Sequence, residues 1–234
     1  MSASPLWGVI AAAGAGLRAG DEIPKQYHVV AGRSVLAWSL DALLAVPGMS
    51  GVMLAVAAED TRATTLPAAE DSRVHFCSGG AERAASVRSA LRALAAIGAG
   101  DEDRVLVHDA ARPAVAVSDI ERLVDAVGDE PDGGLLACPV RDTLKRADAN
   151  GTVAETAARE GLWQAMTPQL FPLGRLRDAL DAADDRVTDE AGAMERMGAR
   201  PILVAASLSN IKYTYPEDAP LLARWMISTG GEGA

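Results

Sequence analysis

The sequence predicts an α/β fold with a mostly parallel, twisted sheet that carries helices on both faces. Two observations support this prediction. Up to Val140, apolar runs typical of buried strands alternate with segments of helical periodicity. No internal repeat and no linker divides the 234 residues, so we expect a single domain over residues 1–234.

Apolar runs predict the strands of this sheet. The runs that alternate with helical segments cover residues 6–11, 51–57, 74–77, 104–108 and 134–140. Shorter runs over residues 202–204 and 211–214 predict late strands. Because parallel strands are buried on both faces, the β-α-β-α order and the near-continuous apolar character of these runs agree with each other.

Helices are predicted where apolar residues at helical spacing lie between residues that cap or break helices. Ser34 can N-cap a helix that runs to about Val46. Glycines follow the helices predicted over residues 82–97 and 118–127, and the second of these begins with Ser-Asp-Ile-Glu, a capping box. The other predicted helices cover residues 176–182, 190–197 and 216–227.

A polar hairpin is predicted after the parallel part of the sheet. Residues 143–147 and 152–156 flank a turn that contains Asn150-Gly151, a strong hairpin signal. Both faces of this hairpin are polar, so we expect a β-arm over about residues 139–160 that projects from the core and serves an interface. The glycine-rich residues 229–234 predict a disordered tail.

The composition argues against several classes of protein. The formal net charge of −10 is unlike that of a general nucleic-acid binder, which would show a basic face. The cysteines, Cys77 and Cys138, are too few for a disulfide framework or a zinc site, and we expect both to be buried on strands. No apolar run reaches the roughly 20 residues that span a bilayer, and no basic residues precede the apolar N-terminus as in a signal peptide. We therefore expect a cytoplasmic protein that binds neither nucleic acid nor membrane.

A loop of small residues follows the first predicted strand and indicates a phosphate site. Its small residues are Ala12, Ala13, Gly14 and Gly16. Such residues let the backbone approach a ligand closely, and their N–H groups can bind anionic oxygens. Arg18 and Lys25 follow within one short segment and can neutralise charge on the same ligand. The pattern predicts a nucleotide; the alternative is a tight turn without a ligand.

The same loop fits the G-x-G-x-x-A fingerprint of dinucleotide-binding proteins, but two observations rank hydride chemistry below phosphate chemistry. A dinucleotide-binding loop leads directly into a helix, which Pro24 prevents. The acidic ribose ligand expected at the end of the second strand is replaced by Ala57-Ala58. An NAD-dependent dehydrogenase is therefore the least favoured function.

Asp109 is expected at the carboxyl end of a strand, where open α/β sheets bind their ligands. A single carboxylate at this place suits Mg²⁺, which takes further ligands from substrate phosphates; the alternative is a turn or cap residue. Arg112 could hold a second anionic substrate. We expect His108 to be a packed or hydrogen-bonded strand residue rather than a base.

A Gly79-Gly80 turn leads into the helix that contains Ser86. The backbone of such a turn and the nearby hydroxyl could bind the edge of a nucleotide base. A strand–helix turn without a ligand explains the same residues equally well.

Further motifs extend this pattern along nearly the whole chain. In order, the motifs are Ala12-Ala13-Gly14-x-Gly16-x-Arg18, Pro24-Lys25-Gln26-Tyr27, Gly79-Gly80-x-Glu82-Arg83-x-x-Ser86, Val107-His108-Asp109-Ala110-Ala111-Arg112-Pro113, Pro139-Val140-x-Asp142-Thr143-x-Lys145, Arg159-x-Gly161-Leu162-Trp163, Thr167-Pro168-Gln169, Thr188-Asp189-Glu190-Ala191 and Asn210-Ile211-Lys212. Each motif is weak alone, but the ordered set is specific. It resembles the 2-C-methyl-D-erythritol 4-phosphate cytidylyltransferases of the non-mevalonate isoprenoid pathway.

The resemblance implies a Rossmann-like nucleotidyltransferase fold, and a homodimer in which each β-arm reaches the partner subunit. It implies that the phosphate of methylerythritol phosphate attacks the α-phosphorus of CTP and that pyrophosphate leaves, with Mg²⁺ or another divalent cation as cofactor. The implied roles are Arg18, Lys25 and Lys212 as catalytic cations; Ala12, Ala13, Gly14, Gly16, Gly80 and Ser86 as nucleotide-binding residues; Asp109, Arg112, Thr143 and Arg159 as substrate-binding residues; and Asp109 as the metal ligand. Thr143 and Arg159 would act on the partner's substrate.

The chain departs from the family pattern at some positions. Ala11 stands where the family usually has Pro, Ala81 where it commonly has Asp, and Ser78 where an acidic residue is frequent. The departure at Ala81 leaves base recognition mostly to backbone groups. Two alternatives stay open: an enzyme that loads CTP onto another polyol phosphate such as ribitol 5-phosphate, and a catalytically silent nucleotide-binding regulatory module.

Overall fold

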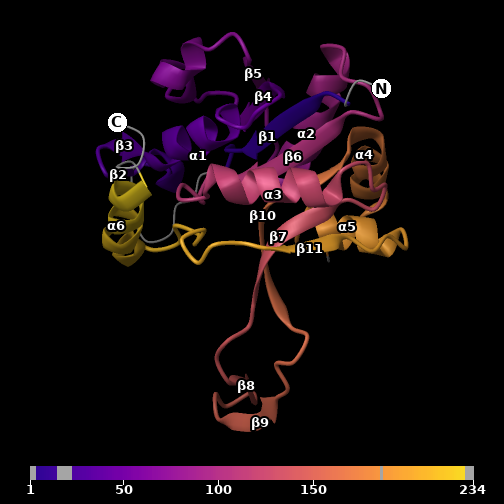
Figure 1. Cartoon of the computed structure of the whole chain (residues 1–234). Helices are drawn as coiled ribbons and strands as arrows, with labels where there is room; N and C mark the ends of the chain where they lie inside the picture. The colour runs from indigo at the N-terminus through magenta and orange to yellow at the C-terminus, as the bar shows by residue number, and fades with distance from the viewer. Residues whose placement is uncertain (1–3, 15–22, 185–186, 230–234) are drawn as a thin grey trace.

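The computed structural model describes residues 4–14, 23–184 and 187–229. Its central feature is a seven-stranded sheet in the order β11-β7-β10-β6-β1-β4-β5 (Figure 1). Neighbouring strands pair in parallel, except that β10 is antiparallel to both β6 and β7. The predicted α/β fold with a mostly parallel sheet is therefore confirmed.

Most strands lie where the apolar runs predict them, with ends that differ by at most two residues. The strands of the sheet are β1 (Leu6–Ala11), β4 (Met49–Val56), β5 (Val74–Ser78), β6 (Arg104–Asp109), β7 (Gly134–Pro139), β10 (Trp163–Pro172) and β11 (Ile202–Ala205). A separate two-stranded ribbon pairs β2 (Val29–Val30) with β3 (Arg33–Ser34).

Strand β10 is the element that the sequence pattern does not predict. Its segment Thr167-Pro168-Gln169 is polar and contains a proline, which is typical of a loop. The strand is nevertheless central, because the buried side chain of Gln169 is fully used: its Nε2 donates to Asp189 Oδ2 at 2.8 Å and its Oε1 accepts from Ala191 N at 2.8 Å. The pairing with β7 shifts register between Ala165 and Gln169, where Pro168 lacks an N–H to donate.

The strand predicted over residues 211–214 is wrong. This segment pairs with no strand, although Tyr213 N donates to Ala111 O at 2.7 Å. The apolar character of this segment reflects burial of Tyr213, which packs with Leu222 and Met226 of the last helix. One buried ring can produce the apolar pattern without a ladder of hydrogen bonds.

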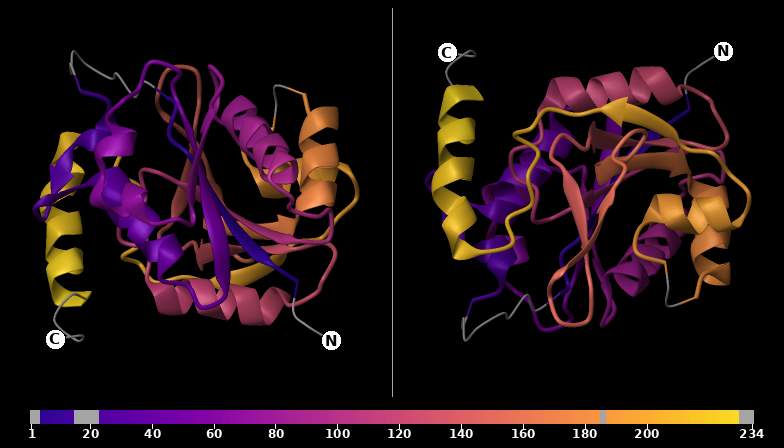
Figure 2. Two further views of the ribbon diagram at one scale, coloured as in Figure 1. Left: turned by 90° about the horizontal axis from the view of Figure 1, so that it is seen from above. Right: turned by 90° about the horizontal axis from the view of Figure 1, so that it is seen from below.

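The helices cover both faces of the sheet (Figure 2). They are α1 (Val35–Leu44), α2 (Arg83–Ala96), α3 (Val117–Val127), α4 (Leu173–Ala182), α5 (Glu190–Arg196) and α6 (Ala219–Thr229). Helices α1 and α3 bury apolar residues in one cluster, whereas α2, α4 and α5 bury theirs in a second cluster across the sheet. Short 3₁₀ helices are η1 (Lys25–Tyr27), η2 (Ala63–Thr65), η3 (Pro67–Glu70) and η4 (Pro216–Asp218).

The predicted polar hairpin is present as β8 (Leu144–Ala147) paired with β9 (Val153–Ala157). It projects well away from the body of the molecule (Figure 1). Nearly all of its side chains are exposed. The use of this β-arm as an interface stays a prediction.

The cysteines, the C-terminal tail and the question of membrane-spanning helices have separate outcomes. Cys138 is buried on β7 as expected, but Cys77 is only half-buried because β5 is an edge strand; both cysteines are free. The predicted tail over residues 229–234 lies outside the described residues except for Thr229, the last residue of α6. Within residues 4–14, 23–184 and 187–229, no helix combines the length and the apolar character needed to cross a bilayer.

The two predicted N-caps have different outcomes. Ser34 caps α1 as expected, since its Oγ accepts from Ala37 N at 3.2 Å. The capping box predicted at Ser118 is wrong, because α3 begins at Val117 with Ala116 as an N-cap that makes no side-chain bond. The buried Asp119 instead joins the first turn of α3 to the segment after β11, because its carboxylate accepts from Ser207 N at 2.7 Å.

We expect Ser34→Ala to lower the free energy of unfolding by about 1 kcal/mol, because it removes the cap acceptor of α1. Ser118→Ala is the matched control and should change stability by less than about 0.5 kcal/mol, as for a surface substitution that breaks no bond. Urea unfolding followed by circular dichroism measures both values. Equal losses in the two variants would contradict the assignment of the caps.

Candidate active site

The site lies where the strand order reverses about β1. Strands β4 and β5 lie on one side of β1, and β6 lies on the other. The carboxyl ends of β1 and β6 are neighbours, because Ala11 pairs with Asp109 in the sheet register. A crevice at such a switch point is the usual ligand site of an open α/β sheet.

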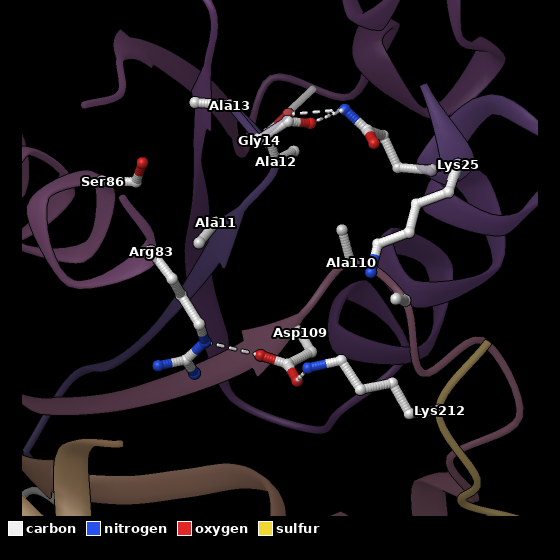
Figure 3. A pocket seen from close by; sticks show the side chains of 12 residues that line it. Ala11, Ala12, Ala13, Gly14, Lys25, Arg83, Ser86, Asp109, Ala110 and Lys212 are labelled. Carbon is white, nitrogen blue, oxygen red and sulfur yellow. Dashed lines mark hydrogen bonds and ion pairs between the residues drawn. The ribbon is translucent and has the colours of Figure 1, made fainter. Parts of the chain in front are cut away.

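A cavity of about 230 Å³ opens at this point (Figure 3). Its lining residues are Ala11, Ala12, Ala13, Gly14, Lys25, Gln26, Arg83, Ser86, Asp109, Ala110, Ala111 and Lys212. The structure thus brings together most of the residues that the sequence selected for a nucleotide site. Lys25, Arg83 and Lys212 extend into it from three separate elements (Figure 3).

The loop after β1 is held in shape by Gln26. The amide Nε2 of this buried side chain donates to Ala12 O at 2.8 Å and to Gly14 O at 3.1 Å. Two carbonyl oxygens of the loop are thereby bound by one side chain, which fixes the course of the backbone there. The sequence motif contains Gln26, but its function in the loop was not predicted, since side-chain-to-backbone pairing over this distance leaves no pattern.

Asp109 is a buried carboxylate between two cations. Its Oδ1 accepts from Arg83 Nε at 2.7 Å and its Oδ2 accepts from Lys212 Nζ at 2.8 Å. Burial alone would raise the pKa of Asp109, but the charges of Arg83 and Lys212 outweigh it and hold this pKa well below its ordinary value. The carboxylate therefore stays ionised at neutral pH.

Arg83 is held in turn by Glu190 from helix α5. Nη1 and Nη2 of Arg83 donate to Oε1 and Oε2 of Glu190 at 2.7 and 2.9 Å. Glu190 is only 1% exposed. Both residues occur in the motifs of the sequence, but no function was predicted for either, because nothing in the sequence shows that two segments so distant pair in space.

His108 is buried, as expected, and its hydrogen bonds define one neutral tautomer. Arg112 O can only accept, so His108 Nε2 carries the proton and donates to it at 3.1 Å. In the neutral ring Nδ1 then accepts from Thr167 Oγ1 at 3.0 Å, and the same hydroxyl oxygen accepts from Asp109 N at 3.0 Å. Burial lowers the pKa of His108 to about 4. With both ring nitrogens engaged, His108 supports Asp109 and Arg112 and does not act as a base.

The Gly79-Gly80 turn brings its backbone close to the loop of small residues after β1. A Cβ atom on Gly79 would lie 2.4 Å from Ala13 Cβ, so only glycine allows this approach. Gly80 N donates to Ser86 Oγ at 3.1 Å, and Ser86 lines the cavity whereas Gly80 is not among the lining residues. The two proposed base contacts therefore form one hydrogen-bonded unit.

Other predicted site residues lie outside the cavity. Arg112 is beside Asp109, with Nε 3.8 Å from Oδ2, but its Nη1 donates to Asn210 O at 2.7 Å. Thr143 and Arg159 lie exposed on the β-arm, where Arg159 donates to Arg141 O. Gly16 and Arg18 lie outside the described residues.

The donors around Asp109 limit how a metal ion could bind. Among the residues that the structure describes, no three or more His, Cys, Asp or Glu side chains gather so that they could hold a metal. Asp109 is a single carboxylate whose two oxygens already face cations. This arrangement does not fit a metal held by protein ligands alone. It fits a cation such as Mg²⁺ that takes most of its ligands from phosphate oxygens and water.

The sheet and its cationic cavity at the switch point define a Rossmann-like nucleotidyltransferase. The family model described as 2-C-methyl-D-erythritol 4-phosphate cytidylyltransferase matches residues 6–228. The chain belongs to this family. A relative from Pseudomonas putida (strain KT2440) that carries the same name is 50% identical over 223 residues, which cover 94% of this chain and 95% of the relative.

Solved structures of the family have the same fold. A 4-diphosphocytidyl-2C-methyl-D-erythritol synthase is 36% identical with a TM-score of 0.85, covering 97% of this chain and 100% of that one. The 2-C-methyl-D-erythritol 4-phosphate cytidylyltransferase of Francisella tularensis is 32% identical with a TM-score of 0.81, covering 95% of this chain and 100% of that one. The Rossmann-like nucleotidyltransferase fold expected from the sequence is thereby confirmed.

The buried His108 makes stability depend on pH in a defined direction. Its pKa is about 4 in the folded chain, below the ordinary value of 6.5, so the unfolded chain binds a proton that the folded chain excludes. The free energy of unfolding should therefore fall by about 2 kcal/mol from this group between pH 7.5 and pH 5. Urea unfolding at several pH values measures the fall. His108→Gln should have a shallower profile by about that amount, and parallel profiles would show that His108 is not the group responsible.

Proposed function

We propose that the chain transfers a cytidylyl group from CTP to 2-C-methyl-D-erythritol 4-phosphate and releases pyrophosphate, a step of isoprenoid precursor biosynthesis. The observation that carries this proposal is the pairing of Ala11 with Asp109 at the switch point. It supports the proposal because it brings the loop of small residues after β1 directly beside a charged carboxylate and its cations. Membership of the family supplies the substrates, since the relatives are named for them.

The reaction needs charge neutralisation more than proton transfer. The nucleophile is a phosphate oxygen that is already anionic, so no general base is required. Lys25 and Lys212 extend into the cavity from η1 and from the segment after β11 (Figure 3). We assign them, together with Arg18, to the negative charge on the triphosphate and on the pentacovalent transition state. This explains why a buried, neutral His108 can lie next to the site without acting on a proton.

The phosphate loop and the Gly79-Gly80 turn would hold the nucleotide. Backbone N–H groups of Ala13, Gly14 and Gly16 would face the triphosphate, and Gly80 with Ser86 would face the base. Ala12 would line the loop, because its own N–H donates to Ala55 O at 2.8 Å. Gln26 supports this assignment, because it binds the carbonyls of Ala12 and Gly14 and so fixes the course of the loop beside the cavity. At position 81 the chain has Ala, so backbone groups would distinguish cytosine from uracil.

We propose that Asp109 holds the divalent cation, which supplies further neutralisation of the triphosphate when bound. Its ionised state at neutral pH supports this role. Arg112 is fixed by Asn210 O and would help to place the phosphate of the second substrate.

The β-arm would complete the site of a second copy. Thr143 and Arg159 lie on the projecting arm and not in the cavity of their own chain, which supports a homodimer in which they bind the partner's sugar phosphate. We also propose that the enzyme acts in the cytoplasm, because Cys77 and Cys138 are both free thiols, as expected in a reducing compartment.

The experiment that tests this function is a pyrophosphate-release assay with CTP, UTP and ATP, each against a panel of polyol phosphates. We expect release with CTP and 2-C-methyl-D-erythritol 4-phosphate above all other pairs. Preferential use of ribitol 5-phosphate would instead assign the sibling activity. Binding of CTP without release from any pair would assign a silent nucleotide-binding module.

We expect Lys25→Ala to lower kcat by about 10²–10³-fold, by analogy with removal of one charge-stabilising donor from a preorganised site. Arg92→Ala is the control, because it removes a surface cation that pairs with Asp181 far from the cavity. Steady-state pyrophosphate release measures both variants. Turnover of Lys25→Ala within a few-fold of the parent would remove Lys25 from the mechanism.

Arg159→Ala should raise KM for the sugar phosphate and change kcat less, since Arg159 would bind substrate rather than the reacting atoms. At a sugar-phosphate concentration below the parent KM both Lys25→Ala and Arg159→Ala are impaired, and mixing the two proteins should restore activity, because a heterodimer contains one intact site. Subunit exchange is confirmed separately by pull-down of differently tagged chains. Exchange without recovery would contradict a site shared between subunits.

A further inference from the structure

Four side chains of alternating charge form a row of ion pairs that leads into the cavity, and two of the four have no function in the mechanism above. It runs from Glu190 through Arg83 and Asp109 to Lys212. Asp109 and Lys212 belong to the proposed chemistry. Arg83 and Glu190 do not, although both are held by short, well-aligned hydrogen bonds.

Glu190 determines where the Arg83 guanidinium lies. Both Nη atoms donate to the two oxygens of Glu190, and this planar fork leaves Nε to face Asp109. Glu190 is 1% exposed, so water does not compete for its carboxylate. The direction in which Nε points, and with it the position of Asp109 Oδ1, depends on this carboxylate.

Glu190 is itself fixed from both sides along the chain. Gln169 of β10 accepts a hydrogen bond from Ala191 N at 2.8 Å and donates to Asp189 Oδ2 at 2.8 Å. Asp189 also caps α5, since its Oδ1 accepts from Gly192 N at 3.0 Å. The residues before and after Glu190 are therefore anchored to the central sheet, which fixes the backbone from which its side chain extends.

Glu190 also changes the charge that Asp109 experiences. Three cations lie near Asp109: Arg83, Lys212 and, at 3.8 Å, Arg112. A carboxylate among three uncompensated cations would attract a fourth, such as Mg²⁺, only weakly. The negative charge of Glu190 offsets that of Arg83, so the network lowers the repulsion that a divalent cation would meet.

We propose that Glu190 is a positioning residue for metal binding: it orients Arg83 so that Asp109 Oδ1 is held in place, and it offsets the charge of Arg83 so that Asp109 can still bind a divalent cation. This proposal rests on the proposed function only through the assignment of Asp109 as the metal ligand. Glu190 does not touch substrate, and acts through Arg83.

The test measures Mn²⁺ binding to the protein–CTP complex, with free Mn²⁺ followed by electron paramagnetic resonance. Glu190→Gln keeps the shape of the side chain and removes its charge. We expect it to weaken Mn²⁺ binding by about 10–100-fold, as for outer residues that orient metal ligands. CTP affinity without metal should stay within about threefold. In turnover, the Mg²⁺ concentration at half-maximal rate should rise, while kcat at saturating Mg²⁺ falls much less.

Asp181→Asn is the matched control. It breaks the exposed Arg92–Asp181 ion pair, which also joins α2 to α4, but far from Asp109. It should leave Mn²⁺ affinity unchanged. If Glu190→Gln lowers the thermal midpoint but binds Mn²⁺ as the parent does, Glu190 only joins α2 to α5 and the proposal is overturned.

The double variant Arg83→Gln with Glu190→Gln keeps the test decisive if the single variant fails to fold, because it leaves no buried charge uncompensated. Removal of both charges should keep Mn²⁺ affinity within about tenfold of the parent and above that of Glu190→Gln. If both variants fold, Mn²⁺ affinity of the double variant as weak as that of Glu190→Gln would contradict charge compensation. If only the double variant folds, complete loss of its Mn²⁺ binding would contradict it. Parent protein that binds Mn²⁺ with CTP but releases no pyrophosphate would overturn the proposed function and leave this inference standing.

Discussion

The pairing of the buried Asp109 carboxylate is the constraint on which the site depends. A carboxylate that is 7% exposed at the end of a strand is costly to bury unless cations and hydrogen bonds surround it. Its cations, Arg83 and Lys212, lie 26 and 103 residues away along the chain. They reach it only when α2 and the segment after β11 have packed against the sheet. Formation of the fold and formation of the charged centre are therefore one event.

The antiparallel strand β10 connects this centre to the rest of the sheet. Thr167 accepts from the Asp109 backbone and, through His108, reaches the carbonyl of Arg112. Two residues further on, Gln169 fixes both neighbours of Glu190. One strand thus holds the backbone of Asp109 through Thr167 and the neighbours of Glu190 through Gln169. The polar side chains of Thr167 and Gln169 are stable at this central position because their donors and acceptors are satisfied.

The sequence predicts those features that depend on local pattern. Parallel strands produce apolar runs, and Asp109 follows such a run directly, so its place at a strand end could be read from its neighbours. Strand β10 could not be predicted in this way, since Pro168 and Gln169 look like a loop until their partners are known. The pairing of Arg83 with Glu190 spans 107 residues and leaves no periodic signal. A family motif can show that such residues occur, but only the packed structure shows what they do.

The β-arm is less stable than the sheet from which it projects. Only Leu144 and Ala157 are half-buried in β8 and β9, and a two-stranded hairpin alone is marginally stable in water. Opening the hairpin locally therefore requires far less free energy than unfolding the sheet, and its amide hydrogens should exchange with solvent first. Any molecule that covers the arm adds its binding energy to this small local stability. How well ordered the β-arm is therefore depends on which molecule binds it and on the concentration of that molecule.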